Sequence, residues 1–87
     1  MAVNLDQPAV VSPAVTLARY VERDPERLGG VPVFRGTRVP VKSLFDHLQA
    51  GDALETFLDD FPGVTREQAR GVIDLAGRRV IAAARLR

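Results

Sequence analysis

The nucleophilic and titratable side chains of this sequence do not form the sets that catalysis or metal binding requires. His47 is the sole histidine, with no other histidine or glutamate at metal-ligand spacing, and we expect it to lie at or near the surface without a functional role. Asp59 and Asp60 are adjacent, so they point to different faces of a helix and do not share a proton. Ser12 and Ser43 have no base within sequence reach. The sequence therefore predicts no enzyme, no metal site and no cofactor.

A more coherent set of polar residues stands at the start of a predicted helix. Thr65 and Gln68 have the spacing of a capping box, and Arg66 and Arg70 lie one turn apart beside them. In a helix-turn-helix unit the start of the last helix enters the major groove, where arginine can bind guanine through two hydrogen bonds. We expect these four residues to bind operator DNA, with either dimerisation or the arginines of the hairpin tip, Arg35 and Arg38, adding the phosphate contacts that a monomeric helix lacks. The alternative is that both arginines are solvated charges stabilised by neighbouring acids.

The last ten residues combine arginines with apolar side chains. As a helix they would carry more apolar surface than a free tail should expose, which is typical of a partner-binding segment. The alternative is a last helix packed on its own core. The residues expected to bind a partner are Arg78, Arg79, Val80, Ile81, Arg85, Leu86 and Arg87.

Charge is distributed unevenly along the chain, although the net charge is only +1. Residues 42–61 contain one lysine and five acids, whereas residues 66–87 contain six arginines and two acids. This asymmetry favours two functional surfaces over ordinary solvated helix faces. Acids on the second helix would repel the DNA backbone, which favours a rival hypothesis: an interaction or dimerisation module with no DNA-binding role.

Apolar residues at helical spacing predict three short helices between residues 41 and 77. The first carries Val41, Leu44, Phe45 and Leu48 and should end at Gly51. The second should be capped by Asp52, with Glu55 in the capping-box position, and should end at Pro62. The third starts at Thr65, and Gly77 should kink it or end it before residues 78–87, the basic C-terminal segment. Its apolar stripe is Ala69, Val72, Ile73 and Ala76.

Upstream of these helices, two short extended segments, residues 31–34 and 38–41, flank the sequence Arg35-Gly36-Thr37. Gly36 can take the positive φ of a tight reversal, so we expect a β-hairpin with a cationic tip, although a plain loop is the alternative. Proline in both arms keeps them short or at an edge. A strand is also expected near residues 18–22, within a β element spanning residues 18–41. Residues 1–14 should form a loose arm.

The hairpin sequence GGVPVFRGTRVPV resembles the signature of a family of small bacterial proteins, the domain of unknown function 433 family. The resemblance covers roughly residues 20–76. It implies an antitoxin that represses its own operon and neutralises a nuclease toxin of the PIN-like type, its cognate partner. The signature positions that we single out are Gly30, Pro32, Arg35, Gly36, Thr37, Arg38 and Pro40.

Length and composition limit the remaining possibilities. A chain of 87 residues makes one domain, here expected over residues 15–87, and so small a core favours association with a partner or a homodimer. The chain has no cysteine, which suits the cytoplasm, and no apolar run long enough to span a bilayer. We therefore expect a cytoplasmic α+β protein, mostly α, with a tri-helical helix-turn-helix of the winged-helix or homeodomain kind and a short N-terminal β-hairpin.

Overall fold

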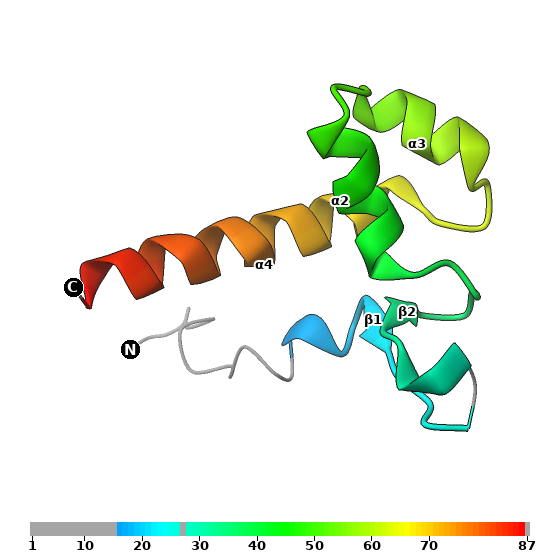
Figure 1. Ribbon diagram of the computed structural model, residues 1–87, viewed down its shortest axis with the longest axis horizontal. Helices are drawn as coiled ribbons and strands as arrows, with labels where there is room; N and C mark the ends of the chain where they lie inside the picture. Colours follow the sequence, from blue (N-terminus) through cyan, green and yellow to red (C-terminus); the bar gives the residue numbers. More distant parts are fainter. Residues whose placement is uncertain (1–15, 27, 87) are drawn as a thin grey trace, which may run out of the picture.

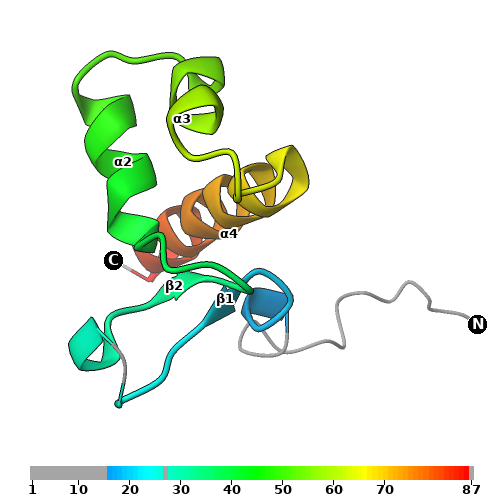
Figure 2. The ribbon, with the colours of Figure 1, turned by 90° about the vertical axis from the view of Figure 1, so that its right-hand side faces the viewer.

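The computed structural model describes residues 16–26 and 28–86, so the expected N-terminal arm lies outside the described residues, as does Arg87. The elements in chain order are β1 (Val21–Glu22), the 3-10 turn η2 (Leu28–Gly30), β2 (Val33–Phe34), α2 (Val41–Gln49), α3 (Leu54–Asp60) and α4 (Arg66–Arg85). The first half of α4 lies between the α2–α3 pair on one side and the two strands on the other (Figures 1 and 2). The predicted α+β architecture, mostly α, is confirmed.

The β element is smaller than the sequence predicts. β1 and β2 are antiparallel and two residues long each, and Val21 pairs with Phe34. The two predicted hairpin arms do meet, because the Phe34 amide donates to the Val39 carbonyl at 3.0 Å and Val33 forms a bridge with Pro40. The strand expected near residues 18–22 is shortened, because residues 16–20 form a helical turn closed by a bond from the Arg19 amide to the Thr16 carbonyl.

Helix α2 begins and ends close to where its pattern predicts. Leu44 is fully buried, and Gly51 has φ +89° just beyond the helix. The Gly51 amide donates to the Leu48 carbonyl at 3.0 Å and the Asp52 amide to the His47 carbonyl at 3.0 Å, which is the pattern of a Schellman motif. The positive φ explains why glycine stands at this position.

The predicted capping of the second helix by Asp52 is wrong. Ala53 is the N-cap of α3, and no side chain makes a capping hydrogen bond there. The Asp52 carboxylate instead lies 2.9 Å from Nδ1 of His47, across the turn between the two helices. A contact with a ring nitrogen therefore replaces the expected bond to a backbone amide, and it ties the end of α2 to the start of α3.

The core lies where the start of α4 meets the other elements. Its fully buried side chains are Phe34 from β2, Leu44 from α2 and Phe57 from α3, and α4 contributes Ala69 and Val72. The rings of Phe34 and Phe57 are tilted with their centroids 6.0 Å apart, an arrangement favoured by aromatic pairs. Every side chain of α4 beyond Ala76 is exposed, so the second half of this helix extends away from the core.

Helix α4 starts where predicted but runs much further. The Thr65–Gln68 capping box is present. The expected end at Gly77 is wrong, because the helix continues to Arg85. Eight residues follow Gly77 in this helix, and the three alanines and three arginines among them favour helix strongly enough to outweigh one exposed glycine, which costs about 1 kcal/mol. None of the helices in the described ranges is long and apolar enough to cross a membrane.

Candidate functional site

The polar residues at the start of α4 are already bonded within the protein. The Gln68 amide donates to Thr65 Oγ1 at 3.0 Å, and Gln68 Oε1 accepts from the Thr65 amide at 3.0 Å. The side-chain nitrogen of Gln68 also donates to the Arg35 carbonyl at 2.9 Å. Thr65 and Gln68 therefore stabilise the helix start and attach it to the turn after β2, which leaves little of either side chain for reading DNA.

Arg66 is held by an acid of the neighbouring helix. Its guanidinium makes two hydrogen bonds to the Glu55 carboxylate, one of them 2.7 Å long from the second terminal nitrogen to Oε1. The bond from Arg66 lowers the pKa of Glu55, and the same bond raises the pKa of Arg66. Both side chains lie at the surface, so the pair is accessible, but DNA would have to displace Glu55 before Arg66 could bind a phosphate or a base.

Arg70 remains as the exposed member of the predicted DNA-binding set. It makes no hydrogen bond or ion pair within the part of the chain that the structure describes. Glu67 is equally exposed one turn earlier. The structure thus places the four predicted residues together at the start of α4, as expected. Of these four, Arg70 alone makes no hydrogen bond or ion pair in the described structure.

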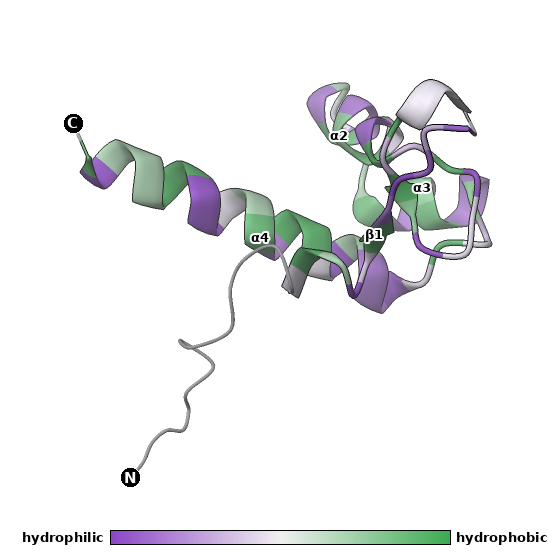
Figure 3. Cartoon of the chain, turned by 90° about the horizontal axis from the view of Figure 1, so that it is seen from below, coloured by the Kyte–Doolittle hydropathy of each residue, from purple (hydrophilic) through white to green (hydrophobic). Residues whose placement is uncertain are grey.

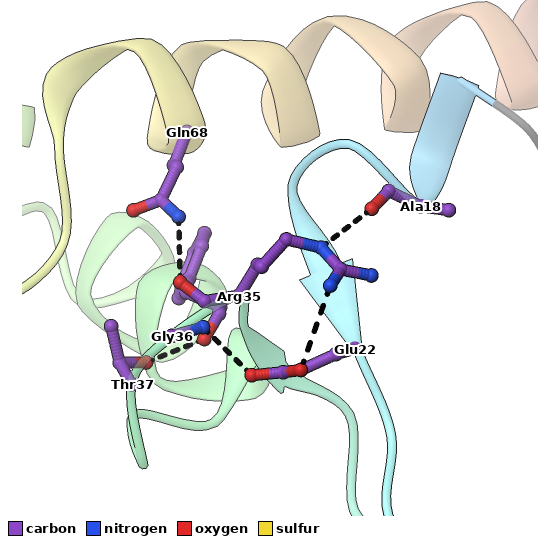
Figure 4. A network of polar contacts seen from close by, with 7 residues as sticks. Ala18, Glu22, Arg35, Gly36, Thr37 and Gln68 are labelled. Atoms are coloured by element: carbon purple, nitrogen blue, oxygen red, sulfur yellow. Dashed lines mark hydrogen bonds and ion pairs between the residues drawn. The ribbon is translucent and has the colours of Figure 1, made fainter.

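The turn after β2 is a structural junction (Figure 4). Gly36 has the predicted positive φ, +79°, and its amide donates to the Glu22 carboxylate at 2.7 Å. The Arg35 guanidinium lies back over the fold, where Nε donates to the Ala18 carbonyl at 2.8 Å and a terminal nitrogen faces Glu22 at 3.7 Å. Thr37 Oγ1 donates to the Phe34 carbonyl at 2.7 Å. The predicted cationic tip is therefore reduced to Arg38, which is exposed.

The remaining signature residues also have structural roles in the backbone. Gly30 has φ +79°, and its carbonyl accepts from Arg23 Nε at 2.6 Å. The Pro32 carbonyl accepts from the Val41 amide at 3.0 Å, and Pro40 is the N-cap of α2. A hollow of about 260 Å³ opens beside the turn, lined by acids and valines together with Arg38. Its acidic residues, Glu22, Asp24 and Glu26, occupy every second position of the sequence and are not among the predicted site residues.

Most acids of the middle segment have partners within the fold. Lys42 Nζ lies 2.9 Å from the Asp46 carboxylate, and Glu55 pairs with Arg66. His47 contacts Asp52 through Nδ1, while its Nε2 lies 3.8 Å from Asp60 and its ring packs edge-on against Phe57 and Phe61. Within the described ranges no three histidine, cysteine or acidic residues are grouped so that they could hold a metal ion. His47 links the α2–α3 turn to the core.

Among the residues that the structure describes, the most exposed large apolar side chains lie in the second half of α4 and at its C-cap, Leu86. Val80 is 67% exposed, Ile81 54% and Leu86 89%. Figure 3 shows this projecting part of the helix with hydrophobic and hydrophilic residues interleaved. Neither Arg79 nor Arg85 makes an ion pair in the described structure, whereas Arg78 donates to Asp74 at 2.8 Å.

One side of this projecting segment forms a shallow apolar hollow. Its lining residues are Leu75, Arg78, Arg79, Ala82, Ala83 and Leu86. Leu75 and the two alanines are not among the predicted partner-binding residues, although Leu75, Ala82 and Leu86 lie at i, i+7 and i+11 along one helix side. Ile81 is absent from this lining. The predicted partner-binding residues therefore divide between two sides of α4.

Comparison with known proteins identifies relatives of this chain. A crystal structure of a DUF433 member protein from Anabaena variabilis ATCC 29413 matches with a TM-score of 0.60 and 21% sequence identity, covering 92% of this chain and 88% of that one. This likeness shows a shared fold. The uncharacterized protein y4eO of Sinorhizobium fredii (strain NBRC 101917 / NGR234) is 42% identical over 50 residues, which are 58% of this chain and 23% of that protein. The chain thus spans less than a quarter of the length of this relative.

The family match covers the β element, all of α2 and α3 and the first half of α4. The model of the family described as "Protein of unknown function (DUF433)" matches residues 21–76. The match ends where α4 leaves the core. This chain belongs to the DUF433 family.

Proposed function

We propose that this protein acts as an antitoxin-like binding protein, which neutralises a PIN-like nuclease toxin by binding it through the projecting second half of α4. The observation that carries the proposal is the uncovered apolar hollow on that segment. The partner class comes from the resemblance of the hairpin sequence to antitoxin-like proteins. The proposal assigns no catalytic step to this chain.

Burial of the exposed apolar side chains would supply the affinity. Leu86, which lines the hollow, is 89% exposed, and burying a leucine fully contributes about 1.5–3 kcal/mol before the cost of association. The helix already presents these side chains in one arrangement, so less conformational freedom is lost on binding than for a disordered tail. A partner with an apolar groove flanked by acids therefore fits this segment.

The arginines on the same segment fit the acidic site of such a nuclease. PIN-like nucleases gather carboxylates around a metal ion, and a guanidinium group can make two charge-assisted hydrogen bonds to one carboxylate. Arg79 lies beside Leu86 in the lining of the hollow and has no ion-pair partner in the described part of the chain. Its charge is available to the toxin without breaking a contact inside this protein.

Co-expression with the product of the neighbouring reading frame tests the proposal. The variant carrying Arg79→Glu and Leu86→Asp should stay folded, since both side chains are exposed, but should no longer co-purify with the toxin or protect cells from it. Ala84→Glu, an exposed change on another side of the same helix, is the matched control and should bind as the wild type does. Truncation after Gly77 should act like the double variant, because every removed residue that the structure describes is exposed. If the double variant still co-purifies and protects, the interface is not this hollow.

A second function, repression of the protein's own operon, is favoured by one observation. The capped start of α4 follows α3 after a short turn, as in a helix-turn-helix, and Arg70 is exposed there. We expect Arg70→Ala to weaken binding to the promoter and to reduce its salt dependence, and Glu55→Gln to strengthen binding by releasing Arg66. A gel shift without any promoter complex at low salt, with or without the partner, would eliminate the DNA role and leave the interaction module.

A further inference from the structure

The solvent-facing side of α4 lies next to the apolar hollow, with which it shares Arg78, and it carries charges in an ordered pattern. Glu67 and Asp74 lie in the first half of the helix, and Arg78 and Arg85 lie in the second half. Asp74, Arg78 and Arg85 follow Glu67 by 7, 11 and 18 residues, which are about two, three and five turns at 3.6 residues per turn. All four charged side chains therefore lie on one side of the helix. All four are exposed.

This charge pattern is complementary to itself when the helix direction is reversed. If the helix is turned end for end about position 76, Glu67 takes the place of Arg85 and Asp74 takes the place of Arg78. A second copy of α4 laid antiparallel on this side therefore sets each acid opposite an arginine, whereas a parallel copy sets like charges opposite each other. Arg70, the exposed charge of the first half that makes no ion pair in the described structure, falls opposite Ala82 of the second copy. The free arginine therefore meets no arginine across the pair.

Small residues beside the charges allow two helices to approach closely. Gly77 and Ala84 are small and exposed, and the position of a Cβ atom at Gly77 has nothing within 4 Å. Ile81 is 54% exposed and lies one turn from each of them. It is the large apolar side chain that this side offers to a partner.

We propose that the protein self-associates as a two-fold symmetric dimer through an antiparallel pairing of this side of α4. The crossing point lies near Gly77, with Ile81 covered by the second copy and with the acids of each first half against the arginines of the other second half. Each Arg78 then lies between its own Asp74, 2.8 Å away, and that of the second copy. With one large apolar side chain per copy, the pairing is weak, reversible and sensitive to salt. Of the residues that line the hollow, Arg78 takes part in this pairing, whereas Leu86 and Arg79 lie on a neighbouring side of the helix and stay outside it.

Paired charge reversals test the pairing and its direction together. One variant carries Glu67→Arg and Asp74→Arg, which makes the side wholly basic, and the other carries Arg78→Glu and Arg85→Glu, which makes it wholly acidic. Each variant alone should be monomeric, with its dimer dissociation constant raised about tenfold or more over the wild type. An equimolar mixture should form a heterodimer containing one copy of each. Sedimentation velocity over a concentration series, with one variant carrying a mass tag, measures both outcomes.

Matched controls make each result decisive. Circular dichroism should show unchanged helix content, and Ile81→Asp, a second exposed change on the same side, should also give a monomer. Arg79→Glu on the neighbouring side should dimerise as the wild type does. A wild-type chain that stays monomeric at the highest attainable concentration would overturn the proposal. So would reversed variants that still dimerise alone, or a mixture that stays monomeric while the wild type dimerises.

Discussion

The same substitution at two glycines of α4 should change stability in opposite directions. At Gly77 a new Cβ atom would meet nothing within 4 Å, so Gly77→Ala should raise the free energy of unfolding by about 0.5–1 kcal/mol through helix propensity alone. At Gly71 the new atom would lie 2.5 Å from two ring carbons of Tyr20. Carbon atoms pack at about 3.5–4.0 Å, so the ring would have to retreat by about 1 Å.

Tyr20 cannot retreat freely, because its partly buried ring packs against the core cluster. Overpacking of this kind costs about 1–3 kcal/mol, which exceeds the propensity gain of about 1 kcal/mol. Gly71→Ala should therefore lower the free energy of unfolding by up to about 2 kcal/mol. For a domain of this size, each 1 kcal/mol shifts Tm by about 4–8 °C, so the two variants should melt on opposite sides of the wild type.

Thermal denaturation of dilute protein, followed by circular dichroism, measures both shifts. A double-mutant cycle isolates the cause: in a Tyr20→Ala background, Gly71→Ala should become stabilising by about 1 kcal/mol, as Gly77→Ala is in the wild type. If Gly71→Ala raises Tm in the wild-type background, the packing of Tyr20 on α4 does not limit this position and the reasoning fails.

Three further predictions concern the turn after β2 and the ion pair beside α4. Gly36→Val should lower the free energy of unfolding by more than about 1 kcal/mol, because a β-branched residue is strained at φ +79°; a wild-type Tm would refute the turn geometry. Arg35→Ala should lower Tm, because it removes the bonds across the junction, whereas Arg38→Ala should not, and equal Tm values for the two variants would contradict the structural role of Arg35. The pKa of Glu55 is lowered in the folded state, so the pair with Arg66 stabilises the protein fully above the ordinary glutamate pKa, and this contribution is lost as pH falls through the lowered value. Urea titrations should therefore separate wild type from Arg66→Ala near neutral pH and bring them together in acid, and a difference that persists in acid would argue against the pair.

Local patterns in the sequence were sufficient for the existence and core-facing sides of the helices and for the turn at Gly36, but not for the cap of α3 or the end of α4. The Thr65–Gln68 box and the glycines at positions 36 and 51 act through neighbouring backbone atoms, so their roles follow from spacing and conformational preference alone. Apolar spacing likewise predicted which side of each helix faces the core, as the buried Leu44 and Ala69 show. These features depend on contacts a few residues apart.

The partners of the charged side chains depended on the tertiary structure. Asp52 had the right type and position to cap α3, but the fold brings the ring of His47 to its carboxylate. Glu55 and Arg66 are eleven residues apart, and no local pattern pairs them. The choice between a capping bond and a cross-helix contact depends on how α2, α3 and α4 pack. A single sequence does not specify that packing.

The sequence by itself determined that this is a DUF433 family member with three helices, a β element before them and a C-terminal segment rich in arginine and apolar residues. Only the tertiary structure decided which of those residues are available to a partner. Thr65, Gln68 and Arg35 make hydrogen bonds within the fold. Helix α4 extends beyond the core, and Arg79 and Leu86 are exposed there. The physical reason is that availability depends on what surrounds a side chain. Residues 33 positions apart in the sequence, such as Arg35 and Gln68, provide those surroundings.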